Sequence, residues 1–312
     1  MNILVTYDYG ESFIKTVGEM GYTVTYKAEK NLLDEDLKGI DILICYNPFR
    51  RLSAAAYEDL SHIILSSTGI DQLPEAIRRS ERIKVTHNRH GYATPIGEWI
   101  VMMLLVGFKR LNRLYDQSLE RRWKLSTDAL ELTDKRVLFL GTGNIAVQAV
   151  QRLKPFGIQP IGLNRSGRSS EHFAEIHRVD QLVNVIGTAD AVVVCLPQTA
   201  ETHCLVNAQA IAAMKDDAVL INISRGAVID ESALTKALAN GKFRFCALDV
   251  VSAEPLAADS PLWQFEQLFI TPHNSWVSEY RNARRLNYIM ENLRRIKDGS
   301  ALLYAVDPKR GY

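Results

Sequence analysis

Short apolar runs alternate with helical patterns along almost the whole chain, and this alternation limits the possible folds more than any other feature. The predicted strands are Ile3–Tyr7, Ile42–Tyr46, Ile63–Ser66, Arg136–Leu140, Ile158–Leu163, Ala191–Cys195, Val219–Ile223, Phe245–Asp249 and Leu268–Ile270. Because helical stretches fall between most of these runs, the pattern predicts βαβ units and parallel sheets, an α/β fold. Many runs are apolar on both faces, as expected where helices cover both sides of a sheet.

A length of 312 residues suggests two domains. A long helix is expected to begin near Pro95, with Thr94 as its N-cap, and to run towards Glu120. The polar stretch 126–135 follows, and we place one domain crossover in this region. The second crossover is expected in or near the helix after Ser275. The predicted first domain is therefore discontinuous, with residues 1–93 plus 285–312, and the second domain takes residues 94–284.

Charge and cysteine usage exclude several classes of function. The net charge of +1 provides no global field, so we expect no nucleic-acid partner and no membrane partner. The longest apolar run, Ile100–Phe108, is too short to span a bilayer, which needs about 20 residues. The four cysteines have no paired spacing, which predicts buried, reduced thiols and no metal site. The N-terminus is typical of a strand rather than a signal peptide, and the expected location is cytoplasmic.

A glycine-rich turn follows one of the predicted strands. The segment RVLFLG leads into a G-x-G-x-x-A turn and then a helical pattern, with the turn residues Gly141, Thr142, Gly143, Asn144, Ile145 and Ala146. Strand, turn and helix in this order are the context that a dinucleotide pyrophosphate site requires. Gly141 permits the turn, Gly143 lets backbone amides approach the phosphates, and Ala146 allows close helix packing. The N-terminus of the helix offers N–H groups and partial positive charge to an anion.

The end of the next strand decides which dinucleotide fits. An acidic residue about 20 positions after the glycines would bind the ribose 2′-hydroxyl of NAD. Here the segment contains no carboxylate and reads Asn164, Arg165, Ser166, Gly167, Arg168. Arginine binds a phosphate through two parallel hydrogen bonds, whereas aspartate repels it, so NADP(H) is expected in preference to NAD(H). NAD(H) stays possible if the two arginines only decorate an exposed loop.

Three more polar segments each follow a predicted strand, and they are 222–226, 248–255 and 271–275. Because ligands bind beyond the carboxyl ends of parallel strands, the three segments are expected to meet in one crevice. They carry Arg225, Glu254 and His273. Hydride attack on a carbonyl group develops negative charge on its oxygen, which a nearby imidazolium can protonate. A neighbouring carboxylate favours the charged form of the imidazole. An arginine can bind the carboxylate of a substrate through two parallel hydrogen bonds. Each residue alone has a structural explanation, but the ordered set favours an oxidoreductase.

These segments resemble motifs of the D-isomer-specific 2-hydroxyacid dehydrogenases, which include phosphoglycerate dehydrogenases and glyoxylate/hydroxypyruvate reductases. The matching segments span nearly the whole chain, and they are 67–71, 94–99, 194–197, NISRGAVIDESAL, ALDVVSAEP and TPHNS. The resemblance implies two Rossmann-like parallel-sheet domains, of which the first is a flavodoxin-like substrate domain. It implies hydride transfer between NAD(P)(H) and a small 2-oxo or 2-hydroxy acid.

The resemblance also implies a homodimer through the long helix after the first crossover. Ile96, Ile100, Met103 and Leu104 are candidate contacts, although burial inside one subunit explains the same pattern.

The resemblance implies roles for individual residues. Arg225 binds the substrate carboxylate, His273 transfers the proton as acid or base, and Glu254 holds the imidazole in its protonated form. Asp249 contacts the nicotinamide carboxamide. The remaining expected cofactor contacts are Thr94, Gly141, Thr142, Gly143, Asn144, Ile145, Asn164, Arg165, Ser166, Arg168, Cys195, Leu196, Pro197, Thr202, Ile223, Ser224 and His273.

Loops of the first domain are expected to select the substrate, and they are 7–10, 46–51, 66–71 and 88–92. Within them, the resemblance implies that Thr68 and Gly69 offer backbone amides to the substrate carboxylate. Arg50, Arg51 and Arg89 favour an extra anionic group such as a phosphate, unless they are solvated surface charges. His87, His90 and His203 are interpreted as loop or surface residues. Glyoxylate, hydroxypyruvate and a larger 2-oxo acid all stay open as substrates.

Two other functions compete with this one. Relatives of the fold serve as dinucleotide-sensing corepressors, and the intact set of Arg225, Glu254 and His273 argues against that role here. The third option is a formate-type dehydrogenase. Its substrate has no 2-hydroxyl group to deprotonate, so the complete acid–base pair argues against this function as well.

Overall fold

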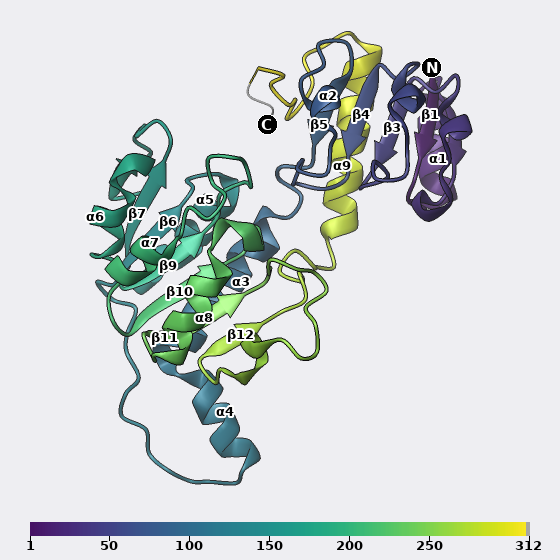
Figure 1. The fold of residues 1–312 in the computed structure, drawn as a ribbon. Helices are drawn as coiled ribbons and strands as arrows, with labels where there is room; N and C mark the ends of the chain where they lie inside the picture. Colours follow the sequence, from purple (N-terminus) through teal and green to yellow (C-terminus); the bar gives the residue numbers. More distant parts are fainter. Residues whose placement is uncertain (310–312) are drawn as a thin grey trace. The chain divides into compact units, whose positions relative to one another are not determined.

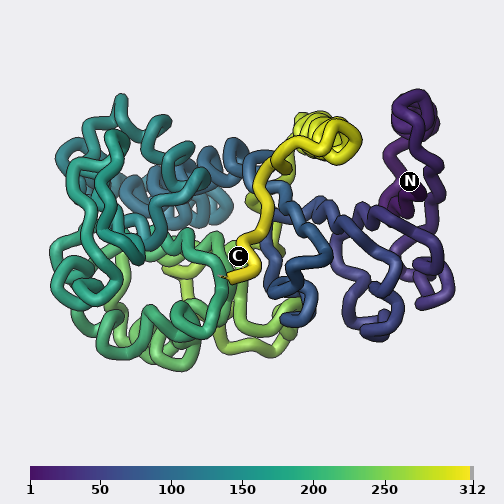
Figure 2. The backbone as a smooth tube through the Cα atoms, turned by 90° about the horizontal axis from the view of Figure 1, so that it is seen from above, coloured from purple at the N-terminus to yellow at the C-terminus, as the bar shows by residue number. Residues whose placement is uncertain are grey.

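The computed structural model describes residues 1–309 and divides into two compact units. The first unit combines Met1–Tyr92 with the segment from Ser278 onward, and the second is Ala93–Val277. Figures 1 and 2 show that the purple N-terminal strands and the yellow C-terminal helix belong to one unit. The predicted second boundary at 284/285 falls inside α9 (Arg281–Lys297), whereas the division precedes this helix. Residues 310–312, assigned above to the first domain, lie outside the described residues.

The first unit is built on a five-stranded parallel sheet with the order β2-β1-β3-β4-β5. Its strands are β1 (Asn2–Val5), β2 (Thr23–Tyr26), β3 (Ile42–Cys45), β4 (His62–Leu65) and β5 (Lys84–His87). Its α-helices are α1 (Glu11–Glu19), α2 (Glu75–Arg78) and α9. This is the flavodoxin-like strand order, in which the direction of sheet growth reverses between β1 and β3.

Alternate side chains of the first sheet enter two different cores. Ile3, Val5, Ile42, Ile44 and Ile64 pack with Phe13 and Val17 of α1 and with Tyr288, Ile289 and Leu293 of α9. Leu4, Leu43, Ile63, Leu65 and Val85 point to the opposite face and pack with residues of the loops and of α2. A strand that is buried on both faces must be apolar at every position, which explains the continuous runs in the sequence.

The second unit is built on a seven-stranded parallel sheet with the order β12-β11-β10-β9-β6-β7-β8. Its strands are β6 (Arg136–Leu140), β7 (Gln159–Asn164), β8 (Glu175–Arg178), β9 (Ala191–Val194), β10 (Ala218–Asn222), β11 (Phe243–Leu248) and β12 (Leu268–Ile270). Its α-helices are α3 (Ala93–Lys109), α4 (Leu111–Leu119), α5 (Asn144–Leu153), α6 (Leu182–Ile186), α7 (Ala208–Ala213) and α8 (Glu231–Ala239). Sheet growth reverses between β6 and β9, as in a Rossmann domain.

The predicted fold class is confirmed, but the sequence patterns missed β2, β5 and β8. All three lie at the edge of a sheet, where a strand has only one neighbour. Their sequences TVTY, KVTH and EIHR are correspondingly polar on one side. An edge strand is not enclosed on both faces, so it lacks the continuous apolar run that identifies a central strand.

The predicted long helix is two helices, because Arg110 has φ 55° and separates α3 from α4. The predicted N-cap at Thr94 is wrong, since α3 begins at Ala93 and Thr94 lies in its first turn. The candidate dimer contacts at 96, 100, 103 and 104 are buried within the chain, where α3 packs on α5 and β11. Burial inside one subunit is therefore the explanation of that apolar pattern.

All four cysteines lie in the described part of the chain and are free thiols. Cys45 and Cys246 are buried as expected, whereas Cys195 and Cys204 are only partly buried. Burial raises the pKa of the Cys45 and Cys246 thiols well above the usual range. Residues 1–309 contain no cluster of three histidine, cysteine or acidic side chains suited to a metal ion. None of the helices in this range is long and apolar enough to cross a membrane.

A buried arginine fastens the end of α3 to the sheet. Arg244 of β11 is 3% exposed, and its guanidinium donates to the backbone oxygens of Gly107 (3.2 Å), Phe108 (3.2 Å) and Asp128. It also pairs with the Asp217 carboxylate at 2.9 Å. A cation at a helix C-terminus satisfies the last carbonyl groups, which have no partner inside the helix.

We expect Arg244→Met to lower the free energy of unfolding by about 2–4 kcal/mol, because buried acceptors would lose a charged donor. Urea denaturation followed by circular dichroism measures the change. Arg113→Met is the matched control, since Arg113 is half exposed and lies 3.9 Å from Asp128. An equal effect of both substitutions would contradict the role given to Arg244.

Candidate active site

The turns that follow five neighbouring strands of the second unit lie at one edge of the sheet. In each turn, a backbone N–H group donates to a backbone oxygen of the neighbouring strand. These hydrogen bonds extend the sheet ladder beyond the last residue of each strand. These bonds are Gly141 N to Leu163 O (2.8 Å), Cys195 N to Leu140 O (2.8 Å), Ile223 N to Val194 O (3.3 Å), Asp249 N to Asn222 O (3.0 Å) and Thr271 N to Leu248 O (3.0 Å). The predicted segments therefore lie at one edge of the sheet within this unit.

The turn after β6 requires glycine at its first position. Gly141 has φ +102°, and a Cβ atom there would lie 2.9 Å from the backbone oxygen of Cys195. A side chain would be strained in that conformation and would collide with the neighbouring turn. The carboxyl ends of β6 and β9 therefore approach each other closely at the point where sheet growth reverses.

The residues at the start of α5 fit a dinucleotide pyrophosphate. Gly143 is the N-cap, it provides no side-chain hydrogen bond, and the first turn contains no acidic residue. A Cβ atom on Gly143 would meet no protein atom within 4 Å, so a ligand has room beside the backbone. Ala146, in contrast, is completely buried against the sheet. α5 therefore packs tightly on the sheet along its buried face, whereas its N-terminus, which attracts anions, leaves room for a ligand.

Asn164, at the end of β7, shapes the loop that was predicted to choose the cofactor. Its amide nitrogen donates to Thr142 Oγ1 (3.0 Å), and its oxygen accepts from Gly167 N (2.7 Å) and Ser166 Oγ (3.3 Å). Arg165 and Arg168 are exposed on this loop. Arg165 pairs with Glu201 at 3.3 Å, a partner that the sequence patterns did not reveal.

Thr202 holds the turn after β9 in shape. Its hydroxyl donates to Pro197 O (2.6 Å) and accepts from Thr199 N (2.8 Å). Leu196, in the same turn, packs against the main core of the second unit. The predicted cofactor contacts 195–197 and 202 therefore form one ordered turn beside Gly141.

The loop that carries Arg225 is shaped by a buried amide. Asn222 accepts from Ser224 N (3.0 Å) and Ser224 Oγ (2.9 Å), and it donates to Arg225 O (3.0 Å). Gly226 follows, and a Cβ atom there would lie 2.0 Å from the backbone carbon of Val251. Only glycine permits this approach, so the loops after β10 and β11 are in direct contact. A polar residue at the end of an apolar strand was the available signal for Asn222.

His273 and Glu254 form the predicted pair. His273 Nδ1 lies 2.9 Å from Glu254 Oε2, and the two side chains are 40% and 39% exposed. An ionised carboxylate only accepts hydrogen bonds, so Nδ1 carries the proton in this bond and Nε2 is left to act on a ligand. Glu254 Oε1 also accepts from Val251 N (3.3 Å), which links the pair to the loop that touches Gly226.

Asp249 fixes the loop that carries His273. Its carboxylate is buried and accepts from Thr271 Oγ1 (2.6 Å), Asn274 N (2.7 Å), Ser275 N (3.1 Å) and Ser275 Oγ. From its motif, Asp249 was expected only to contact the cofactor, and this positioning role was not predicted. The signal was an aspartate directly after the apolar run Phe245–Leu248.

In the first unit, Thr68 and Gly69 lie in the loop after β4. Thr68 Oγ1 donates to Asn88 O (2.9 Å), and the ring of His87 donates from Nδ1 to Thr68 O (2.7 Å). Within residues 1–309, neither the Thr68 amide nor the Gly69 amide donates a hydrogen bond. His87 is not a loop residue as predicted, because it ends β5. Burial lowers the pKa of His87 and favours its neutral form.

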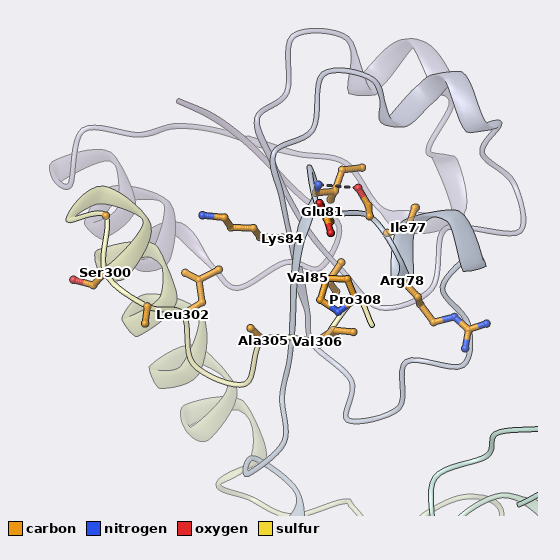
Figure 3. Close-up of a pocket in the computed structure, with 14 residues that line it drawn as sticks. Ile77, Arg78, Glu81, Lys84, Val85, Ser300, Leu302, Ala305, Val306 and Pro308 are labelled. Carbon is orange, nitrogen blue, oxygen red and sulfur yellow. Dashed lines mark hydrogen bonds between the residues drawn. The ribbon is translucent and has the colours of Figure 1, made fainter. Parts of the chain in front are cut away.

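A pocket of the first unit is formed by other residues. Figure 3 shows it between the start of β5 at Lys84 and Val85 and the C-terminal segment with Leu302 and Val306. Lys84 is the first residue of β5, so this pocket lies at the amino end of the strand. The predicted substrate loops follow the carboxyl ends, and the pocket does not contain them.

Comparison with known proteins places the chain in a family. The family of the D-isomer specific 2-hydroxyacid dehydrogenases, through its NAD binding domain, matches residues 101–275. A protein of Corynebacterium melassecola, named only as an uncharacterized protein in the proB 3′ region, is 31% identical over 287 residues. The match covers 89% of this chain and 92% of that protein.

Two further relatives carry functional names. Glyoxylate/hydroxypyruvate reductase A of Klebsiella pneumoniae is 30% identical over 224 residues, which are 71% of this chain and 70% of that protein. The solved structure of a D-isomer specific 2-hydroxyacid dehydrogenase from Xanthobacter autotrophicus, with NADPH and MES, aligns at a TM-score of 0.82 and 25% identity. It covers 100% of this chain and 99% of that one.

The family match covers more than half of the chain, and the fold and the ordered motifs agree with it. The chain therefore belongs to the D-isomer specific 2-hydroxyacid dehydrogenase family, whose members are oxidoreductases that use a nicotinamide dinucleotide.

Proposed function

We propose that this protein reduces a small 2-oxo acid to the D-2-hydroxy acid, or catalyses the reverse reaction, with NADP(H) as the preferred cofactor. The observation that carries the proposal is the His273–Glu254 pair, whose carboxylate is linked to the loop that touches Gly226. Arg225 precedes Gly226 on that loop, and the glycine turn lies at the same sheet edge. Proton donor, carboxylate-binding cation and dinucleotide turn thus share one edge of the second unit.

The dinucleotide supplies the hydride for reduction or accepts it in the reverse direction. The turn 141–145 and the N-terminus of α5 would hold its pyrophosphate. The turn 195–197 with Thr202 would line the adenine side. Thr94, Ile223, Ser224 and Asp249 are the other proposed contacts, with Asp249 at the carboxamide.

This chain's own residues would position the substrate and move the proton. Glu254 accepts from Nδ1 and orients the imidazole, so that Nε2 of His273 donates a proton to the carbonyl oxygen or removes one from the hydroxyl. The Arg225 guanidinium binds the substrate carboxylate and thereby fixes the position of the carbonyl group. In the first unit, the amides of Thr68 and Gly69 are proposed to donate to a carboxylate. Asp249 also positions His273 indirectly, because its carboxylate holds the loop that carries this histidine.

We expect the purified protein to oxidise NADPH in the presence of glyoxylate, hydroxypyruvate or phenylpyruvate, measured by absorbance. His273→Asn removes the general acid and is expected to lower kcat by about 100-fold or more. His62→Asn is the control, because His62 is the first residue of β4 and therefore lies at the amino end of that strand, away from the loops that follow the carboxyl ends. If the protein binds the dinucleotide but turns over none of these acids, the enzymatic proposal is wrong and the sensor function is favoured.

The preference for NADP(H) rests on the loop after β7. Arg165 and Arg168 are exposed on it, and it contains no carboxylate that would bind a ribose 2′-hydroxyl or repel a 2′-phosphate. The Arg165–Glu201 pair is exposed, so a phosphate can compete for this guanidinium at little cost.

Arg165→Asp is expected to lower the NADPH to NADH ratio of kcat/KM by about 10-fold to 100-fold, because it replaces a phosphate-binding cation by a repelling anion. Fluorescence titration of both dinucleotides gives a second reading without turnover. Lys154→Asp makes the same charge change at the opposite end of α5 and is the control. If the NADPH preference survives Arg165→Asp, the loop does not choose the cofactor.

We further propose that the homodimer forms through α4 and the segment after it. No residue of α4 is buried, and the region exposes six large apolar side chains: Leu111, Leu114, Tyr115, Leu119, Trp123 and Leu125. Large apolar side chains exposed together on one segment are typical of an interaction site. The buried residues of α3 have no part in this proposal.

The double substitution Leu119→Glu and Trp123→Glu is expected to convert the dimer to a monomer, because it places charge in an apolar interface. Size-exclusion chromatography with light scattering measures the mass. Phe156→Glu, at another exposed aromatic residue of the second unit, is the control. A dimer that persists in the double variant places the interface elsewhere.

A further inference from the structure

The backbone of His273 adopts a conformation that residues other than glycine rarely take. Its φ angle is 52°, in the left-handed region, where the Cβ atom of a side chain is crowded by the following carbonyl oxygen. The loop 271–276, which follows β12, contains no helix or strand residue. A left-handed conformation persists where surrounding contacts fix it, so the direction of the imidazole depends on what holds this loop.

Hydrogen bonds fix the N–H groups on both sides of this residue. The amide of His273 itself donates to Asp249 O (2.9 Å) and to Thr271 O (2.9 Å). Beyond it, the Asp249 carboxylate accepts from the amides of Asn274 (2.7 Å) and Ser275 (3.1 Å). These bonds hold the N–H groups of the loop, and they leave the carbonyl oxygen of His273 to another donor.

That donor is an indole three residues further along the loop. Trp276 is partly buried, and its Nε1 donates to His273 O at 2.7 Å. The peptide group between His273 and Asn274 is therefore held at both ends, because its N–H group donates to Asp249 and its oxygen accepts from Trp276. Since a peptide group is planar, it cannot turn without breaking one of these bonds, and turning would change the backbone angles of His273.

The chemistry of tryptophan makes this contact separable from simple packing. An indole has one hydrogen-bond donor and no acceptor, so the bond to His273 O depends on a single N–H group. A phenyl ring in the same place would keep most of the apolar surface and lose only the bond. A role as a wall of the substrate site would depend on the ring, whereas a role in holding the backbone depends on the N–H group.

We propose that Trp276 is a positioning residue of the active site, whose indole N–H group locks the left-handed conformation of His273 and thereby directs the imidazole towards Glu254. Glu254 Oε2 lies 2.9 Å from Nδ1 and completes the orientation, so that Nε2 faces the ligand. Trp276 acts through the backbone of the histidine and not by touching the substrate. The inference rests on the proposed function, because the proton transfer by Nε2 is the step that this positioning serves.

Trp276→Phe tests the inference, measured with NADPH and the 2-oxo acid that the wild-type protein reduces fastest. We expect kcat to fall by about fivefold to twentyfold, with KM for the acid and Kd for NADPH each changed by less than about twofold, because only the proton donor is misplaced. Trp263→Phe is the matched control, since Trp263 Nε1 also donates to a loop oxygen of the second unit, that of Ala257 (2.9 Å).

Two results would overturn the inference while leaving the proposed function intact. One is a wild-type kcat in Trp276→Phe, or a loss no larger than that in Trp263→Phe. The other is a higher KM for the acid with an unchanged kcat, because the indole would then contact the substrate instead of holding the histidine.

A nitrogen-15 NMR measurement reads the orientation of the imidazole without turnover. In a neutral imidazole the nitrogen shifts distinguish a proton on Nδ1 from one on Nε2, and the His273 signals are those lost in His273→Asn. We expect the Nδ1–H form in the wild-type protein and in Trp263→Phe, and a mixture of both forms in Trp276→Phe. An unchanged ratio in Trp276→Phe would overturn the inference. A changed ratio in a protein that turns over no acid would support the positioning and overturn the proposed function.

Hydrogen exchange of the wild-type indoles decides if Trp276→Phe does not fold. We expect the N–H group of Trp276 to exchange more slowly than that of Trp123, whose side chain is fully exposed. Equal exchange rates would show that the bond to His273 O is not maintained, and the inference would be wrong.

Discussion

Parallel strand pairing is the constraint on which the function of the second unit depends. It brings the carboxyl ends of five neighbouring strands to one edge, where backbone bonds such as Asp249 N to Asn222 O carry the ladder into the turns. Residues more than a hundred positions apart, such as Gly141 and His273, therefore project from the same sheet edge. A different register or strand order would separate them, whatever their individual chemistry.

Polar side chains at the strand ends then convert this shared edge into a defined site, and of these Asn222 and Asp249 are buried. Asn164, Asn222 and Asp249 each end or directly follow a strand, and each uses its side chain to fold the loop beyond it. The residues proposed to act on the ligands, Arg225 and His273, sit on loops that these side chains hold. Because an unsatisfied buried amide or carboxylate is costly, such loops resist rearrangement, and this rigidity keeps donors and acceptors in place.

The two units use the same topological rule with different chemistry. In the second unit, the reversal between β6 and β9 lies beside a glycine turn and a helix N-terminus that fit a pyrophosphate. In the first unit, the reversal between β1 and β3 lies above Arg285 and its tyrosines. The switch point of the second unit is proposed to offer backbone N–H groups to phosphates, whereas that of the first unit places a buried guanidinium among tyrosine rings.

Features that depend on adjacent residues could be inferred from the sequence alone. The central strands were visible as continuous apolar runs, and the glycine turn was visible because strand, turn and helix adjoin in the chain. The motifs containing Arg225, Glu254 and His273 identified the family, and the structure joins His273 to Glu254 through the loop beside Gly226.

Features that depend on residues distant in the chain became visible only in the folded protein. The edge strands β2, β5 and β8 are recognisable only by their pairing, and the apolar face of α3 proved to be buried against α5 and β11. Arg285 was not singled out by the sequence patterns, and it is enclosed because α9 packs on the sheet that Tyr7 and Tyr46 border. Burial and charge compensation arise from contacts between remote segments, and a linear pattern does not contain them.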